Sequence, residues 1–522
     1  METTISRRLT PVAEALAPCV LQKLRDEIRA LRSAAEEYER VHSRALEDVL
    51  PAHRPSARNL LHYLALRHED ARDVQAHLAR VGLSSLGRAE SHVLVTLDRM
   101  DGLLTLALGE TLSPQPEAAP HLGFREGERR LEHNSMSLLG TGRDGRPVRI
   151  MVTLPSEAAT DLQLVEDMAA AGMDCARINC AHDDEAAWQS MVENVHVAGR
   201  RQGRDLKVLM DLPGPKLRTG RIGGSKKPRV KPGDRVLLVE RLDEGPEPPE
   251  DTGVAVAEGP VRELRKNVNE GDVVWIDDGR IQTRVLGLDA TGILLGVIHT
   301  TKEKGVKLTP EKGVNLPGRR VEASALTDED RGYLRFASEL ADAVSLSFVR
   351  TPSDVDELID AMAGLRNTDL GVVLKIETVE GFSNLPHLLL RAMRRPATGI
   401  MIARGDLAVE VGFERLAEVQ EEVLWICEAA HVPTVWATQV LEQLAKTGTP
   451  SRAEITDAAM SVRAEAVMLN KGKHILSAIG TLDEILLRME AHQLKKRSLM
   501  RPLRVSLLED SLARHDDTNA MP

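Results

Sequence analysis

Two short apolar stretches that each end in charged residues decide the fold of this chain: LKIETVEG (residues 374–381) and GIMIARGDLAVE (399–410). Side chains two residues apart on a strand share a face, so Lys375 and Glu377 can enter one site. Asp406 follows the second stretch, after Gly405, where the missing side chain lets the backbone approach a ligand closely. A lysine beside two carboxylates indicates a divalent cation that holds an anionic, oxygen-rich substrate. We therefore expect a phosphate or enolate site here.

Working outward, short β-branched runs alternate with helical stretches from residue 148 onward, the pattern of β/α units. Eight such runs are present: Val148–Leu154, Cys175–Asn179, Lys207–Asp211, Ala343–Phe348, Gly371–Ile376, Gly399–Ala403, Pro433–Ala437 and Ala466–Leu469. Most of them precede an amphipathic segment such as Ser353–Leu365. Eight strands with crossovers predict an α/β fold, a (β/α)₈ TIM barrel.

Two further regions frame the predicted barrel. Residues 219–313 alternate strand-like pieces with turn signals, which predicts an inserted β domain at the end of the barrel where active sites lie. Residues 1–110 are expected to be helical, in the segments Leu24–Val49, Ala57–Leu66, Asp70–Val81 and Gly87–Leu108, with a linker at Thr111–Gly123. The expected domains are 1–145 (helical extension and linker), 146–218 with 314–490 (barrel), 219–313 (β lid) and 491–522 (tail).

Composition limits the function. The 522 residues carry a net charge of −11 and only 4 Trp, 3 Tyr and 5 Phe, which argues against nucleic acid as a partner. No apolar run approaches a membrane span, and the first residues lack the apolar segment of a secretory signal. The four cysteines have neither metal-site spacing nor the number of a disulfide scaffold. We expect a cytoplasmic protein without a membrane partner.

Polar residues end almost every predicted barrel strand. They are Arg177 and Asn179, Asp211, Ser347, Lys375 and Glu377, Asp406, Thr438, and Asn470. A single polar residue after a strand is more often a solvated loop residue. Agreement among so many strand ends instead predicts one site at the C-terminal rim of the barrel.

A family resemblance can now be given. The segments that carry it are AGMDCARINCAHD (171–183), DLPGPKLRTG (211–220), IDDGRIQ (276–282), KGVNLPG (312–318), VSLSFVR (344–350), LKIETVEG (374–381), IMIARGDLAVEV (400–411) and ATQVLEQL (437–444). In this order they resemble pyruvate kinase over residues of about 148 to 490. The resemblance implies transfer of a phosphoryl group from phosphoenolpyruvate to ADP, giving pyruvate and ATP, with a mobile lid over the nucleotide.

The same resemblance implies roles for the substrate side of the site. Glu377 and Asp406 would ligate Mg²⁺, with Mn²⁺ as an alternative. Lys375 would neutralise the phosphoryl group in transfer, and Arg177 would hold the same phosphate. The backbone at Gly405 and Asp406 would cradle the substrate carboxylate. Thr438 would help deliver a proton to the enolate carbon.

On the nucleotide side, the resemblance places Arg177, Asn179, His182 and Arg218 near the phosphates of ADP and ATP. Members of the family that need K⁺ hold it with Asn, Ser and Asp side chains and the backbone carbonyl of a Thr. This chain keeps Asn179 and Asp211 but has Ala181 in place of the Ser and Leu212 in place of the Thr. Their usual Glu is Lys216 here, and members with Lys at this position do not require K⁺. We therefore expect Lys216 to replace K⁺, the alternative being a solvated loop lysine.

Other features depart from the family. Residues 154–158 and 470–474 differ from the family's loops, so selectivity or acceptor could differ. Only 32 residues follow Glu490, so the family's C-terminal regulatory domain and control by sugar phosphates are not expected. The turn at residues 84–88, with Arg58, Arg67 and His92 nearby in sequence, could bind an anion. A helical hairpin packed on the barrel or on a second subunit is the favoured interpretation, and we expect a homo-oligomer through either region.

Two other functions stay open at this point. A Mg²⁺-dependent carbonyl lyase would also stabilise a pyruvate enolate on a Glu and an Asp. A non-catalytic sensor could retain the phosphoenolpyruvate site without turnover. The predicted lid and the position of Lys375 favour phosphoryl transfer over the lyase.

Overall fold

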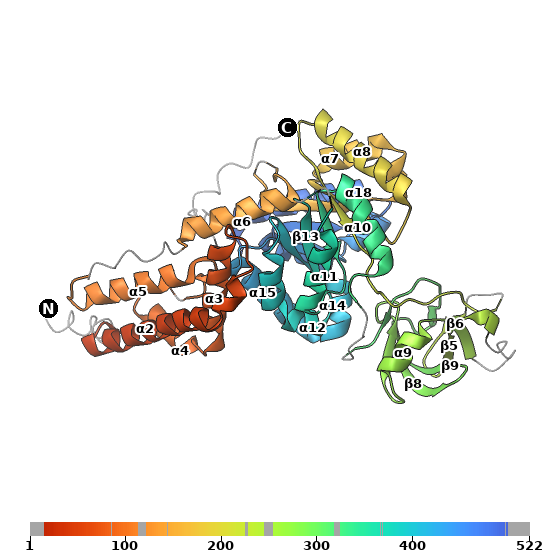
Figure 1. The fold of residues 1–522 in the computed structure, drawn as a ribbon, viewed down its shortest axis with the longest axis horizontal. Helices are drawn as coiled ribbons and strands as arrows, with labels where there is room; N and C mark the ends of the chain where they lie inside the picture. Colours follow the sequence, from red (N-terminus) through yellow and green to blue (C-terminus); the bar gives the residue numbers. More distant parts are fainter. Residues whose placement is uncertain are drawn as a thin grey trace, which may run out of the picture.

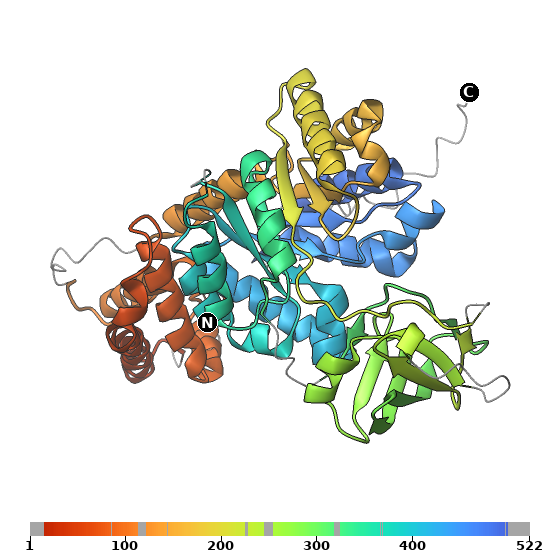
Figure 2. The same ribbon diagram turned by 45° about the vertical axis from the view of Figure 1, so that its right-hand side comes forward.

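The computed structural model describes residues 15–84, 86–112, 122–143, 145–224, 228–244, 254–317, 324–365, 367, 369–495 and 497–498. A barrel lies at the centre, with a helical extension on one side and a β domain on the other (Figures 1 and 2). Most of the expected linker Thr111–Gly123 and most of the predicted tail 491–522 lie outside the described residues, as do Ser85 and Gly318.

Eight parallel strands close the barrel in the order β1-β16-β15-β14-β13-β12-β3-β2. They are β1 (Arg149–Thr153), β2 (Cys175–Asn179), β3 (Lys207–Asp211), β12 (Ala343–Leu346), β13 (Gly371–Ile376), β14 (Thr398–Ala403), β15 (Thr434–Ala437) and β16 (Ala466–Leu469). Their residues are almost all buried, because side chains fill the barrel on one face and helices cover the other. The predicted TIM barrel is confirmed, and each strand lies within two residues of its predicted bounds.

Helices surround the barrel between its strands (Figure 1). They are α7 (Leu162–Ala171), α8 (Glu185–Arg201), α10 (Asp328–Leu340), α11 (Pro352–Met362), α12 (Val379–Ser383), α13 (Leu385–Ala392), α14 (Arg404–Val411), α15 (Phe413–Ala429), α16 (Glu442–Thr447), α17 (Arg452–Met460) and α18 (Ile475–Glu490). Thr327 and Ser451 begin α10 and α17 with capping boxes, so their hydroxyls satisfy backbone donors that the first turn leaves free.

The inserted domain has its own sheet and core. Six strands pair in the order β11-β7-β8-β9-β5-β6. The elements are β4 (Arg229–Val230), β5 (Arg235–Val239), β6 (Val254–Glu258), α9 (Val261–Asn267), β7 (Val273–Ile276), β8 (Ile281–Asp289), β9 (Gly292–Thr300), β10 (Val306–Lys307) and β11 (Val314–Asn315). Buried Val, Leu and Ile side chains form a cluster separate from the barrel core. The domain is therefore a distinct unit that the two connecting segments hold beside the barrel mouth.

The N-terminal extension packs on the side of the barrel. It contains α2 (Pro18–Val41), η1 (Ser43–Leu46), α3 (Arg54–His68), α4 (Arg72–Arg80), η2 (Glu90–His92) and α5 (Val93–Ala107). The Asn59 amide donates hydrogen bonds to the carbonyls of Glu90, at 2.7 Å, and Ala429 of α15, at 2.8 Å. The expected helix Leu24–Val49 was too long, because the α-helix ends at Val41 and a 3₁₀ turn follows.

Helix α6 (Phe124–Leu139) was not predicted and closes the N-terminal end of the barrel. Leu138 and Leu139 join the side chains of the barrel interior in one buried cluster. A Cβ atom on Gly371 or Gly399 would lie 2.6 Å or 2.5 Å from Leu138, so these strand starts need glycine to admit the leucine. Helix α6 is polar on average, and the surface that its few leucines cover exists only once the barrel has closed. Within the described part of the chain, no helix is long and apolar enough to cross a membrane.

Candidate active site

Lys375 stands at the C-terminal end of β13 with its ammonium group fixed from three sides. Its Nζ donates a hydrogen bond to Ser347 Oγ at 2.7 Å and lies 3.3 Å from Glu377 Oε1 and 3.4 Å from Asp211 Oδ1. The Ser347 hydroxyl in turn donates to the carbonyl oxygen of Leu212 at 2.6 Å, which leaves its lone pairs to the lysine. The charge is thus held in place before any ligand binds, as stabilisation of a moving phosphoryl group requires.

Glu377 is buried beside Lys375, and each of its carboxylate oxygens already has one contact within the protein. Its Oε2 accepts a hydrogen bond from the backbone N–H of Phe348 at 2.6 Å. Phe348 adopts a φ of 54°, a left-handed conformation that bulky residues rarely hold without a structural reason. Burial raises the pKa of Glu377, Lys375 opposes that shift, and the nearby negative charge of Asp406 adds to it. The two carboxylates therefore form a site that favours an added cation.

Asp406 lies in the first turn of α14, opposite Glu377, and pairs with Lys216. The Lys216 Nζ lies 2.8 Å and 2.9 Å from the two carboxylate oxygens, and the Asn315 amide donates to Oδ1 at 3.3 Å. Burial acts to raise the pKa of Asp406, but the charge and hydrogen bonds of Lys216, the hydrogen bond from Asn315 and the charge of Lys375 together lower it. The ammonium of Lys216 also lies 3.7 Å from Asp278 of the β domain. It therefore links the barrel to the lid.

The donor set around these carboxylates fits a Mg²⁺ ion. Among the described residues no group of three or more His, Cys, Asp or Glu side chains could form a complete metal cage. Mg²⁺ needs no such cage, because it commonly takes one or two carboxylates and fills its other positions with water and substrate oxygens. Beside Asp406, the buried Asn315 Oδ1 has no hydrogen-bond partner. Glu377 and Asp406 would hold the ion, and this amide oxygen offers a neutral acceptor next to it.

Arg177 of β2 is held at the barrel mouth by side chains of the two neighbouring strands, Asp211 of β3 and Thr153 of β1. Its Nε donates to Asp211 Oδ2 at 3.0 Å, and its Nη1 donates to Thr153 Oγ1 at 2.9 Å. Burial acts to raise the pKa of Asp211, but the charges of Arg177 and Lys375 and the hydrogen bonds from Ser345 and Arg177 together lower it. Asp211 thus aligns the two cations on one side of the site, as a pair that an anionic group can bridge.

The loop after β15 places Thr438 against the start of α14. The N–H of Gly405 donates to Thr438 Oγ1 at 2.8 Å, so the hydroxyl proton of Thr438 remains available to another acceptor. Thr438 has a φ of 63°, which the fold must impose.

Arg404 explains how this strained loop is held, and sequence analysis missed it. Its guanidinium donates to the carbonyls of Ala437 at 3.0 Å and Thr438 at 2.6 Å, and to Asp457 Oδ2 at 2.9 Å. It also stacks over the Trp436 ring at 4.7 Å from the ring centroid. Its position directly after a buried strand was the available signal. Arg404 is a positioning residue for Thr438.

The predicted nucleotide residues form a neighbouring wall. Asn179 Oδ1 accepts the N–H of Ala181 at 3.2 Å, which shapes the turn after β2. Burial lowers the pKa of His182, and the positive charges of Lys471, Arg218 and Arg177 lower it further. Positive groups from several strand ends therefore gather around His182. Lys471 belongs to this wall although it was not among the predicted site residues.

Comparison with known proteins agrees with this geometry. The model of the family described as pyruvate kinase, barrel domain, matches residues 145–475. The chain belongs to the pyruvate kinase family.

Individual pyruvate kinases align over the same part of the chain. That of Sporosarcina psychrophila is 31% identical over 353 residues, which make up 66% of this chain and 57% of the relative. That of Staphylococcus saprophyticus is 31% identical over 376 residues, 70% of this chain and 61% of the relative. That of Mycobacterium intracellulare is 33% identical over 349 residues, 66% of this chain and 70% of the relative. The chain thus spans less than two thirds of the first two pyruvate kinases, and its extension and α6 lie outside the range of the family model.

Proposed function

We propose that this protein catalyses phosphoenolpyruvate + ADP + H⁺ → pyruvate + ATP with Mg²⁺ and without a requirement for K⁺. The observation that carries the proposal is the fixed ammonium of Lys375 between Ser347, Glu377 and Asp211 at the mouth of the barrel. A phosphoryl-transfer site consists mainly of positioning and charge stabilisation, which this rigid arrangement supplies. Membership of the pyruvate kinase family supports the same reaction.

Different residues would act in different parts of the phosphoryl transfer. An oxygen of the ADP β-phosphate attacks phosphorus, and the bond from phosphorus to the enol oxygen breaks. Lys375 and Arg177 stabilise negative charge on the phosphoryl group as it moves. A Mg²⁺ ion on Glu377 and Asp406 supplies further charge neutralisation when bound. Substrate binding would have to draw Arg177 partly away from Asp211, with which it is paired here.

The enolate that leaves must gain a proton at carbon. The Thr438 hydroxyl accepts from Gly405 N–H and keeps its own proton for donation toward the substrate side. A proton relayed through this hydroxyl would complete the formation of pyruvate. The wall of His182, Arg218 and Lys471 would hold the phosphates of the nucleotide.

The position of Lys216 supports independence from K⁺. Its ammonium is mostly buried between Asp406 and Asp278, where it supplies one fixed positive charge near the substrate phosphates. Burial acts to lower the pKa of Lys216, but the charges of Asp406 and Asp278 raise it, so the group stays protonated at neutral pH. Ala181 offers no side-chain oxygen for a K⁺ ion where the family members that need K⁺ have a Ser.

A coupled assay tests these proposals. ATP formation from phosphoenolpyruvate and ADP is measured with Mg²⁺, in buffers with K⁺ and with tetramethylammonium in its place. We expect similar rates in the two buffers and a loss of about 10³-fold in Lys375→Ala, the size seen when a charge-stabilising donor is removed. No ATP but cleavage of a 2-oxo acid would favour the lyase. Binding of phosphoenolpyruvate without either reaction would favour the sensor.

Assembly and cellular location remain predictions. We expect a cytoplasmic homo-oligomer that self-associates through the barrel or the extension. Light scattering at several protein concentrations tests the assembly, and a mass equal to one chain at all of them would contradict it.

A further inference from the structure

A hollow of about 270 Å³ lies in the helical extension, away from the barrel mouth. Residues before η2, the first three turns of α5 and the start of α6 line it. Among its lining residues are Arg88, His92, Thr96, Arg99, Met100 and Phe124, and none of its lining residues is an Asp or a Glu. Its volume is near the lower end of the range for ligand pockets, which suits a small molecule.

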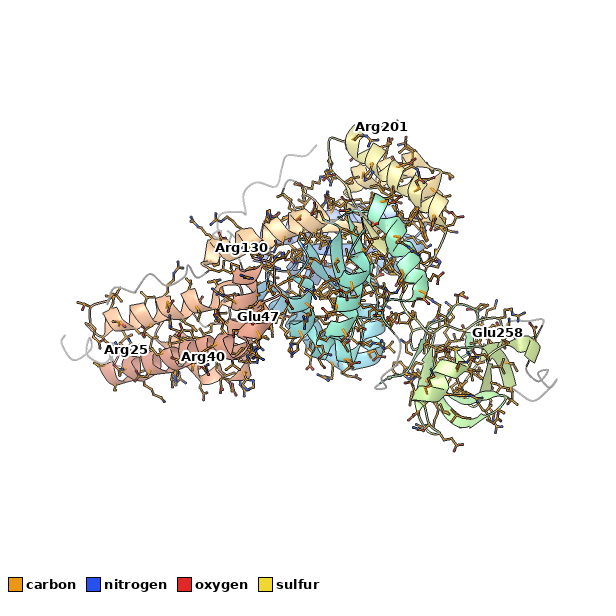
Figure 3. The ribbon with its side chains drawn as sticks, viewed as in Figure 1. Arg25, Arg40, Glu47, Arg130, Arg201 and Glu258 are labelled. Carbon is orange, nitrogen blue, oxygen red and sulfur yellow. The ribbon has the colours of Figure 1, made fainter. Side chains whose placement is uncertain are left out.

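Two cationic side chains without acidic partners meet in this hollow. Most arginines on the helices of the extension are paired: Arg25 with Glu110 at 2.6 Å, for example, and Arg29 with Asp101 at 2.6 Å. Figure 3 shows Arg25 and Arg40 along α2, at a distance from the barrel. By contrast, Arg88 and Arg99 have no ion pair or side-chain hydrogen bond to any residue that the structure describes, and both are exposed. Two unpaired positive charges that line the same hollow attract an anion to it.

Most of the other side chains that line the hollow are apolar. The His92 ring is only 7% exposed and meets the Phe124 ring edge-on, with 5.2 Å between the ring centroids. Leu103 is 53% exposed beside it, although it lies on a helix with a buried opposite face. Exposed apolar side chains next to a charged rim are typical of a ligand site. The wall would stack on the apolar body of a ligand while the arginines hold its charged group.

We propose that this hollow binds a small organic anion, a carboxylate or phosphate monoester with an apolar or aromatic body. Arg88 and Arg99 would hold the anionic group, and Phe124, Met100 and Leu103 would contact the body. The site is separate from the proposed active site and does not depend on the reaction proposed there. It also differs from a bare helix start, because Arg88 precedes η2 and Arg99 lies in the second turn of α5.

Isothermal titration calorimetry on the full chain tests the site with phenyl phosphate and benzoate as probes. Inorganic phosphate and benzyl alcohol are the partial probes, which have only the charge or only the ring. The variant Arg88→Ala/Arg99→Ala removes both cations. Its matched control is Arg44→Ala/Arg80→Ala, which removes two exposed arginines of the same extension that do not line the hollow and have no acidic partner among the described residues.

We expect at least one probe with both groups to bind about tenfold more tightly than either partial probe. The hollow variant should lose that binding by about tenfold, and the control should retain it. Phe124→Ala should weaken phenyl phosphate more than inorganic phosphate. Preference for phenyl phosphate or for benzoate would tell a phosphate ligand from a carboxylate ligand. Three results would overturn the proposal: no binding of either full probe, equal binding in the hollow variant and the wild type, or equal loss in the two double variants.

Discussion

A divalent cation bound at the proposed metal site would compete with Lys216 for the carboxylate of Asp406, so the Lys216→Met variant is the most direct test of that site. The Lys216 ammonium lies 2.8 Å from Asp406 Oδ1, and both side chains are mostly buried. A metal ion on Asp406 must first displace this ammonium or share the carboxylate with it. Removing the ammonium should therefore tighten the binding of Mg²⁺ to the protein without substrate.

The size of the effect follows from the contact. At 2.8 Å the attraction between unit charges is about 6 kcal/mol for an effective dielectric constant of 20, and about 1.5 kcal/mol for water. The displaced ammonium keeps the carboxylate of Asp278, 3.7 Å away, so the lower value is the better guide. A difference of about 1.4 kcal/mol is tenfold in a dissociation constant. We expect Mg²⁺ to bind Lys216→Met about tenfold more tightly than the wild type.

Calorimetric titration of Mg²⁺ at pH 8 without substrate is the assay. A high pH is chosen because the variant loses the charge of Lys216, which lowers the pKa of Asp406, and fewer protons then compete with Mg²⁺ for the carboxylate. Lys312→Met is the matched control, because Lys312 pairs with Asp277 of the β domain at 2.9 Å and touches neither proposed metal ligand. Equal Mg²⁺ affinity in the wild type and Lys216→Met, or weaker affinity in the variant, would refute the competition.

Three further variants test the scaffold around the site. Arg404→Lys loses the paired contact with Asp457 and the stack on the Trp436 ring. We expect kcat to fall about tenfold while KM for the nucleotide and the circular dichroism spectrum stay unchanged. A change in KM and in the spectrum together with kcat would contradict a positioning role. Gly371→Ala should destabilise the barrel by about 1–3 kcal/mol through its clash with Leu138, and adding Leu138→Ala should cost less than the two separate losses predict, measured by urea unfolding. Burial between the extension and the barrel lowers the pKa of His431 to about 4. Because the unfolded chain already binds this proton below about pH 6.5, the free energy of unfolding of the wild type should fall by up to about 3 kcal/mol between pH 6.5 and 4. In His431→Gln the free energy of unfolding should depend less on pH over this range.

Local patterns account for the parts of the fold that were predicted. The barrel strands are short β-branched runs bounded by turn signals, and several were predicted to the residue, for example Cys175–Asn179 and Gly371–Ile376. Helix α6 was missed for the opposite reason. Its sequence is polar and contains a glycine. The packing of Leu138 against Gly371 and Gly399 joins residues that are far apart in the sequence and cannot be read from α6 alone.

The sequence by itself determined which groups arrive at the rim, because alternation along a strand fixes that Lys375 and Glu377 share a face. It also determined the family, through ordered motifs spread along the barrel. Only the tertiary structure decided which of these side chains contact one another. Lys216 meets Asp406 across 190 positions of sequence, and Arg404 holds the loop of Thr438 from a different strand. Charged groups pair only when they lie within a few ångströms of each other, and these groups come that close only when the barrel closes and brings the strand ends together.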